Sequence, residues 1–208
     1  MARQTRQRIL DASLSMFNTQ GEPNVTTNHI ADELEISPGN LYYHFRNKDD
    51  IIEQLFGGYE QRMDAALTAP SGRLPELEDV WLQLHLVFEC IWDYRFLYRD
   101  QVDILSRNRG LRMRFARILR RADEQAHKVM RGLAQAGIMR ASAPEVDAAA
   151  TNILVIATFW LNYAAARGDK DERASIRDGI VQVMMLIAPF LRDAERVHLN
   201  TLTRAYLD

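Results

Sequence analysis

The chain has 208 residues and a formal net charge of −2, and 47% of its residues are apolar and 26% charged. This profile is typical of a soluble globular protein that buries a sizeable core, in one large domain or two unequal ones. The nearly neutral charge by itself indicates neither a nucleic-acid partner nor a membrane surface. Cys90 is the only cysteine, which excludes an intramolecular disulfide and fits a reducing cytoplasm.

No targeting or membrane segment is expected. The first residues, MARQTRQRILDASLSMF, place charges inside the apolar pattern and so lack the apolar run of a signal peptide. No stretch is continuously apolar over roughly 18 residues, which predicts that nothing spans a bilayer. We therefore expect a cytoplasmic protein with no membrane partner.

The N-terminal segment predicts short helices. Residues 6–19 place Ile9 and Phe17 at helical spacing, and Gly21-Glu22-Pro23 ends this first helix. Thr26 is a good N-cap for the next, short helix.

A break and a third short helix follow. Glu35-Ile36 forms a tight break, Ser37 caps the next helix, and Pro38 occupies its first position, where a missing N–H group is tolerated. This helix ends near Arg46. Asn47 then caps a longer helix with two aspartates in its first turn, which favours the helix dipole.

The rest of the chain predicts longer helices and no strand, repeat or low-complexity tract. Apolar periodicity marks them at about 47–69, 75–93, 100–107, 110–136, 144–166 and 171–189, with an ambiguous tail beyond. We therefore expect an all-α protein. Its N-terminal three-helix helix-turn-helix domain covers residues 1–48, and a larger C-terminal helical bundle covers residues 49–208.

The residues of the third helix divide between a core-facing side and an outward-facing side. Two short helices joined by a three-residue turn form a helix-turn-helix, whose second helix can enter a DNA major groove. Leu41 and Phe45 fall on one face and define the core side. Tyr43 points the other way, with Gly39 one turn before it and Asn40 beside it, where these residues can meet base edges.

Residues at the edges of this surface are placed to reach phosphates. The predicted DNA-contacting set is Thr27, Asn28, Pro38, Gly39, Asn40, Tyr42, Tyr43, His44 and Lys48. An ordinary helical hairpin with exposed tyrosines fits the same geometry. Charge does not separate the two interpretations, because residues 1–50 hold five basic and seven acidic side chains.

The run VTTNHIADELEISPGNLYYHFRNKDDII at residues 25–52 resembles the DNA-binding domain of TetR-family transcriptional regulators, and the resemblance covers about residues 6–52. It implies a non-enzymatic, all-α homodimer that binds a palindromic operator as a repressor. A small ligand in the C-terminal domain would release the DNA. Glu35 departs from the family pattern, which usually has glycine there, and left-handed geometry at this residue would cost roughly 1 kcal/mol.

Aromatic residues predict a ligand pocket in the C-terminal domain. The proposed ligand-binding residues are Trp81, His85, Phe88 and Trp92, which recur on one helical face, and Phe159 and Tyr163 on a second helix. Such a pocket suits a small hydrophobic or aromatic effector. A core stripe whose histidine is partnered by Glu89 explains the first set equally well. No cofactor or metal is expected.

Residues 95–121 hold nine arginines and two acids, a balance of 9 − 2 = +7. Three interpretations are open: an anionic effector site, a contact with the acid-rich DNA-binding domain, and a solvated helix face. If the effector is a carboxylate, Arg95 or Arg99 is the better candidate because both follow the aromatic stripe.

Two further features concern signalling and assembly. Gly57-Gly58 lies inside a predicted helix, as a flexible point between domains, as a place of close backbone packing or as an early end of the helix. The helices of about 145–166 and 171–189 are too apolar to be single-faced, and in the TetR family the matching helices form a four-helix dimer interface.

Two other classes of function compete with a DNA-binding regulator. One is an enzyme in a helical bundle, metal-dependent or not, although the five histidines are scattered along the chain. The other is a dimeric interaction protein whose hairpin binds protein. Salt-dependent binding to DNA would separate the first interpretation from these two.

Overall fold

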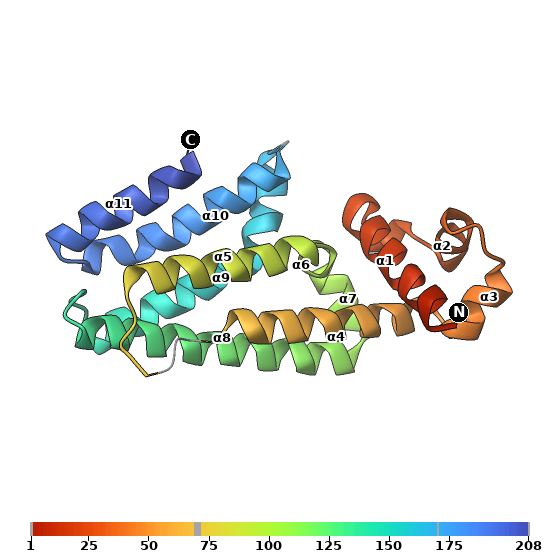
Figure 1. The fold of residues 1–208 in the computed structure, drawn as a ribbon, viewed down its shortest axis with the longest axis horizontal. Helices are drawn as coiled ribbons and strands as arrows, with labels where there is room; N and C mark the ends of the chain where they lie inside the picture. The colour runs from red at the N-terminus through yellow and green to blue at the C-terminus, as the bar shows by residue number, and fades with distance from the viewer. Residues whose placement is uncertain (1, 69–71, 170, 208) are drawn as a thin grey trace. The chain divides into compact units, whose positions relative to one another are not determined.

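The computed structural model describes residues 2–68, 72–169 and 171–207 (Figure 1). Every regular element among these residues is helical, apart from one isolated bridge between Met139 and Leu191, so the all-α prediction is confirmed. The helices are α1 Ala2–Gln20, η1 Glu22–Asn24, α2 Thr27–Glu33, α3 Pro38–His44, α4 Lys48–Ala66, α5 Leu77–Asp93, α6 Phe96–Arg99, α7 Gln101–Arg107, α8 Arg109–Gln135, α9 Ala143–Arg167, α10 Glu172–Ile187, η2 Ala188–Phe190 and α11 Asp193–Leu207.

The chain divides into two compact units. Unit 1 comprises Met1–Arg62 and Asp93–Arg114, and unit 2 comprises Met63–Trp92 and Phe115–Asp208. By packing, therefore, α6, α7 and the start of α8 belong with the N-terminal helices. The functional boundary expected after residue 48 is a different kind of division and stays a prediction.

Unit 1 is built around a core of apolar side chains from α1 to α4 and α6. Its fully buried members include Ile9, Phe17, Ile30, Leu41, Phe45, Phe56, Tyr59 and Phe96. The polar side chain of Asn18 joins α1 to the α5–α6 corner: its Nδ2 donates to the carbonyl of Asp93 at 2.8 Å, and its Oδ1 accepts from the amide of Phe96 at 3.1 Å. One buried amide thus fixes two distant segments of the chain together.

Unit 2 is a helical bundle in which α9 and α10 pack along each other and α11 packs on α10. A Cβ atom on Gly179 of α10 would lie 2.6 Å from a ring carbon of Phe88 and 2.7 Å from one of Trp160. The missing side chain therefore lets three helices approach closely. The tail that the sequence left ambiguous is the helix α11.

The apolar helix α9 departs from the prediction that no segment is apolar enough to span a bilayer. By length and composition alone it is apolar enough to cross a membrane. An 18-residue window of α9 has a high mean hydropathy, although polar residues interrupt its apolar sequence. The core helix of a soluble protein passes the same test, so this is weak evidence of a span.

Candidate nucleic-acid interface and ligand pocket

The helix-turn-helix is held by side-chain caps at the start of both of its helices. The Oγ1 atom of Thr26 accepts a hydrogen bond from the amide of His29 at 3.2 Å, which starts α2. The Oγ atom of Ser37 accepts from the amide of Asn40 at 3.1 Å, and Pro38 occupies the first turn of α3. Both caps were predicted, because Ser and Thr satisfy amide groups that a helix leaves unpaired.

The faces of α3 divide as the helical wheel predicts. Leu41 is completely buried and Phe45 is 1% exposed, whereas Tyr43 is 79% exposed. Gly39 and Asn40 are exposed as well. A short helix thus presents an unobstructed outer surface, and the contact of these residues with DNA stays a prediction.

At the edge of this surface, two predicted phosphate contacts bond to each other. The hydroxyl groups of Thr27 and Tyr42 lie 2.9 Å apart and tie the start of α2 to α3. The rings of Tyr43 and His44 meet edge to face at 5.0 Å. Asn28, the other predicted contact on α2, is exposed.

The turn between α2 and α3 has left-handed backbone geometry at Glu35, the position where the sequence departs from the family's glycine. Glu35 has a φ of 52° and is the single non-glycine residue with positive φ among the described residues. Its amide bonds to the carbonyl of Asp32 at 3.1 Å, and the amide of Ile36 reaches back to the carbonyl of Ala31 at 3.0 Å. These bonds hold Glu35 in a conformation that costs an L-residue roughly 1 kcal/mol.

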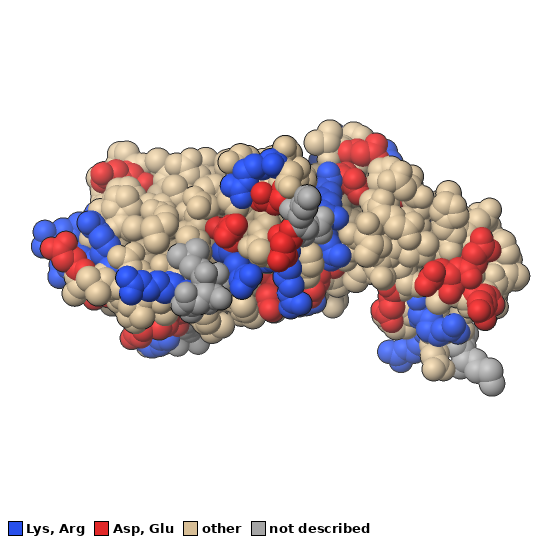
Figure 2. All heavy atoms as spheres, turned by 90° about the horizontal axis from the view of Figure 1, so that it is seen from above, with Lys and Arg blue, Asp and Glu red and all other residues tan. Residues whose placement is uncertain are grey.

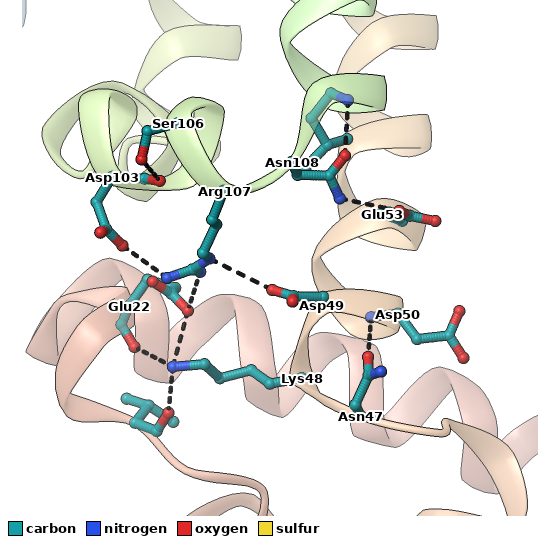
Figure 3. Close-up of polar contacts among 12 residues, drawn as sticks. Glu22, Asn47, Lys48, Asp49, Asp50, Glu53, Asp103, Ser106, Arg107 and Asn108 are labelled. Carbon is teal, nitrogen blue, oxygen red and sulfur yellow. Dashed lines mark hydrogen bonds and ion pairs between the residues drawn. The ribbon is translucent and has the colours of Figure 1, made fainter.

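Lys48 differs most from its expected placement. Its ammonium forms an ion pair with Glu22 at 2.8 Å and donates to the carbonyls of Glu22 and Val25, both at 3.0 Å (Figure 3). All three donors of the ammonium are therefore engaged within the protein. The predicted phosphate contact would require Lys48 to leave these partners.

Arg107 of α7 shares the same carboxylate. Its guanidinium lies 2.6 Å from Oε1 of Glu22 and 2.6 Å from Asp103 on its own helix, and 3.4 Å from Asp49 (Figure 3). Glu22 is completely buried. Nothing in the local sequence around Glu22 signals this pair, because its partner lies 85 positions away.

The arginines of residues 95–121 do not share one role. A contact with the first 50 residues, one of the three interpretations, is confirmed for Arg107 and also for Arg99, which donates to the carbonyl of Asn18 at 3.0 Å. Arg114 pairs with Glu60 at 2.7 Å instead. The solvated-face interpretation describes exposed members such as Arg109, Arg112 and Arg120.

Acidic side chains gather over the helix-turn-helix on the face drawn in Figure 2. Asp32 and Glu33 of α2 and Glu35 of the turn are exposed. On the first helix, the guanidinium of Arg6 lies 4.8 Å from the ring centroid of Phe45. The basic side chains that suit a phosphate backbone in this region lie on α1 and, as Arg46 and Lys48, just after α3.

The predicted ligand residues of α5 divide into two groups: some line a cavity and one is buried in the core. The rings of Trp81 and His85 stack at 5.7 Å, and Nε2 of His85 lies 3.4 Å from Glu89. Phe88 is completely buried against α10, as the core interpretation expected.

A cavity of about 450 Å³ lies between α5 and α10. His85 and Trp92 line it from α5, and Ile176 and Ile180 supply apolar wall from α10. Four charged side chains of the described residues also line the cavity: Arg173, Arg177, Glu89 and Asp171. Neither arginine was predicted as a ligand contact, because the excess of arginine in the sequence lies in residues 95–121.

Phe159 and Tyr163 lie elsewhere in unit 2. They are 48% and 55% exposed, and with Val155 they line a separate cavity of about 410 Å³ on α9. The structure therefore does not bring the two predicted groups of aromatic residues into one pocket. Positions 155, 159 and 163 recur every four residues, so they form a stripe along one side of α9.

A capped helix-turn-helix with an exposed second helix, joined to a larger helical bundle that contains a cavity, defines the class of helix-turn-helix transcriptional regulators. Within the described residues, no group of three or more His, Cys, Asp or Glu side chains is arranged to hold a metal ion.

Comparison with known proteins identifies the family. The model for "Bacterial regulatory proteins, tetR family" matches residues 9–55, and a model for a TetR "Bacterial transcriptional repressor" matches residues 58–199. The chain therefore belongs to the TetR family of DNA-binding transcriptional regulators, whose members are not enzymes.

Relatives and solved structures agree with this assignment. The HTH-type transcriptional repressor KstR2 of Mycolicibacterium smegmatis is 30% identical over 109 residues, which cover 49% of this chain and 51% of KstR2. The chain thus spans about half the length of this curated relative. A TetR-family regulator from Marinobacter aquaeolei VT8 is 37% identical with a TM-score of 0.89, covering 97% of this chain and 98% of that structure. A SmeT–triclosan complex, at 22% identity and a TM-score of 0.61 over 92% and 93% of the two chains, shows the same fold.

Proposed function

We propose that this chain is a ligand-responsive repressor that acts in the cytoplasm. A homodimer binds a palindromic operator through α3 of each protomer, with residues 1–48 as the DNA-binding part and residues 49–208 as the part for ligand binding and dimerisation. The observation that carries the proposal is the position of Tyr43, which is 79% exposed directly opposite the buried Leu41.

The test is a selection of bound fragments from sheared genomic DNA, followed by affinity measurements at several salt concentrations. Tyr43→Ala should abolish preference for the selected fragment while leaving the circular-dichroism spectrum unchanged. Val102→Ala is the matched control, because Val102 of α7 is also 79% exposed. Salt-independent binding, or equal affinity of Tyr43→Ala and the wild type, would refute a DNA-reading role for α3.

For the dimer, support comes from the apolar stripe of α9. Val155, Phe159 and Tyr163 are each about half exposed, and Met185 of α10 is 37% exposed. Exposed large apolar side chains in a row mark interaction surfaces. Pairing two such surfaces about a twofold axis would give a four-helix interface, and a dimer aligns two reading helices about 34 Å apart along DNA.

For the effector, support comes from the cavity between α5 and α10. Its aromatic and aliphatic walls suit an apolar body, and Arg173 and Arg177 suit an acidic group. We expect a panel of aromatic carboxylates to release DNA better than their uncharged amides. The double variant Arg173→Ala/Arg177→Ala should abolish this difference, whereas Arg131→Ala on α8 should not.

A further inference from the structure

Glu22 is a buried carboxylate between α1 and α2 with two cations on one of its oxygens. The side chain is completely buried, and Lys48 at 2.8 Å and Arg107 at 2.6 Å both meet Oε1 (Figure 3). The other oxygen, Oε2, has no hydrogen-bond partner within the described part of the chain. Two cations thus meet one carboxylate, and one of them, Arg107, also pairs with Asp103 and Asp49.

The two cations come from different elements. Lys48 opens α4, four residues after α3 ends at His44, and its side chain is 25% exposed. Arg107 ends α7, and the next residue, Asn108, caps α8 by accepting from the amide of Leu111 at 3.0 Å. Arg107 therefore belongs to the α7–α8 junction, whereas Lys48 belongs to the first turn of α4, just after the reading helix α3.

A buried carboxylate tolerates the loss of one partner but not of both. An unpaired charge in the interior is strongly destabilising, whereas a carboxylate that keeps one cation stays compensated. Lys48 can consequently leave Glu22 only while Arg107 remains there. Arg107 is well suited to remain, because its planar fork also reaches Asp103 at 2.6 Å and Asp49 at 3.4 Å.

We propose that Arg107 is a positioning residue for DNA binding: by neutralising Glu22 it frees the ammonium of Lys48 for an operator phosphate. When Arg107 is withdrawn, Lys48 is the sole counter-ion of Glu22 and stays inside the protein. The inference rests on the proposed function, since it needs operator DNA as the second partner of Lys48. It assigns Arg107 a role in DNA binding without a contact to DNA.

The salt dependence of DNA binding tests this role, because each phosphate contact contributes about 0.9 to the slope of log K against log salt concentration. The DNA is the fragment that the wild-type full-length chain selects from genomic DNA. Lys48→Met should reduce the slope by about 0.9 per bound protomer. Arg107→Met should reduce it by the same amount, and the double variant Lys48→Met/Arg107→Met should reduce it no further.

Two rescue variants separate positioning from a general structural effect. Arg107→Lys keeps a cation beside Glu22 and should retain the wild-type slope. Glu22→Gln/Arg107→Met removes the charge that holds Lys48 and should restore the slope that Arg107→Met loses. Arg112→Met is the matched control: Arg112 of α8 is exposed, and removing its charge should leave the slope unchanged.

Each other outcome overturns the inference. A wild-type slope in Arg107→Met, or a low slope in Glu22→Gln/Arg107→Met, contradicts the link through Glu22. An unfolded Arg107→Met, judged by circular dichroism, contradicts the premise that one cation suffices for Glu22. If Lys48→Met keeps the full slope, Lys48 contacts no phosphate and the inference fails while DNA binding stands. If no DNA fragment is selected, the proposed function itself fails.

Discussion

The hydroxyl oxygen of Tyr94 lies 2.8 Å from the point that a Cβ atom on Gly58 would occupy. The neighbouring Gly57 has more room, because the nearest atom to its Cβ position is a guanidinium nitrogen of Arg114 at 3.8 Å. The helix α4 runs unbroken through both residues. An early helix end is therefore wrong for this pair, and close packing accounts for Gly58 but leaves Gly57 unexplained by contact.

We expect Gly57→Ala to raise the free energy of unfolding by about 0.5–1 kcal/mol, because alanine restricts the unfolded chain and favours helix. Gly58→Ala should stabilise less or destabilise, since its methyl group must displace Tyr94. Urea denaturation of both variants checks this, and equal stabilisation would contradict the packing argument.

The hinge hypothesis can be tested with Gly57 alone. Gly57→Ala should leave operator affinity intact and weaken release by an effector, if flexibility at this position transmits the signal. Fluorescence anisotropy of labelled DNA during effector titration measures the release. An unchanged titration curve would refute the hinge.

Glu35 in the turn provides a second prediction. Glu35→Gly should raise the free energy of unfolding by about 1 kcal/mol, because glycine adopts a φ of 52° without a Cβ clash. The matched control is Glu33→Gly, which removes the same charge from the last residue of α2 and should destabilise. Stabilisation by both variants would point to charge rather than backbone strain.

In unit 2, His127 of α8 forms a pH-dependent interaction with Asp147 of α9. Its Nδ1 donates to the carbonyl of Asp123 at 2.8 Å and its Nε2 to the carboxylate of Asp147 at 3.0 Å, a pattern that requires both ring nitrogens to be protonated. The hydrogen bond to Asp123 raises the pKa of His127 above its ordinary value, although burial opposes this, and Asp147 adds to the increase.

A raised folded-state pKa stabilises the fold below the unfolded pKa of about 6.5, and this stabilisation is lost as the pH rises through the folded pKa. The free energy of unfolding should therefore fall between about pH 6 and pH 8 by more in the wild type than in His127→Phe. Urea denaturation across this range measures the difference. If the free energy of unfolding changed with pH in the same way in both proteins, a stabilising role of protonated His127 would be excluded.

The apolar stripe of α9 predicts the oligomeric state. Phe159→Glu places a charge on a residue that is 48% exposed in the chain alone, and it should convert the dimer to a monomer in sedimentation at micromolar concentration. Val102→Glu, an equally polar change on α7, should leave the dimer intact. A dimeric Phe159→Glu, or a monomeric wild type, would contradict the proposed interface.

Local features of the fold were predictable from the sequence. The caps Thr26 and Ser37 and the opposite directions of Leu41 and Tyr43 follow from helix geometry, which acts over three or four residues. The left-handed turn at Glu35 followed from its place in the family pattern. The tail beyond residue 189 was left ambiguous, and the structure forms the helix α11 there.

The sequence by itself determined the helices, the helix-turn-helix and the face of α3 that looks outward, because backbone hydrogen bonds and side-chain periodicity are local. Only the tertiary structure decided that Lys48 turns inward to Glu22, that Arg107 meets the same carboxylate, and that Arg173 lines a cavity with residues of α5. These placements depend on which distant segments pack together. A buried charge takes whichever counter-ion the packing brings within reach, and no local pattern specifies a partner 85 residues away.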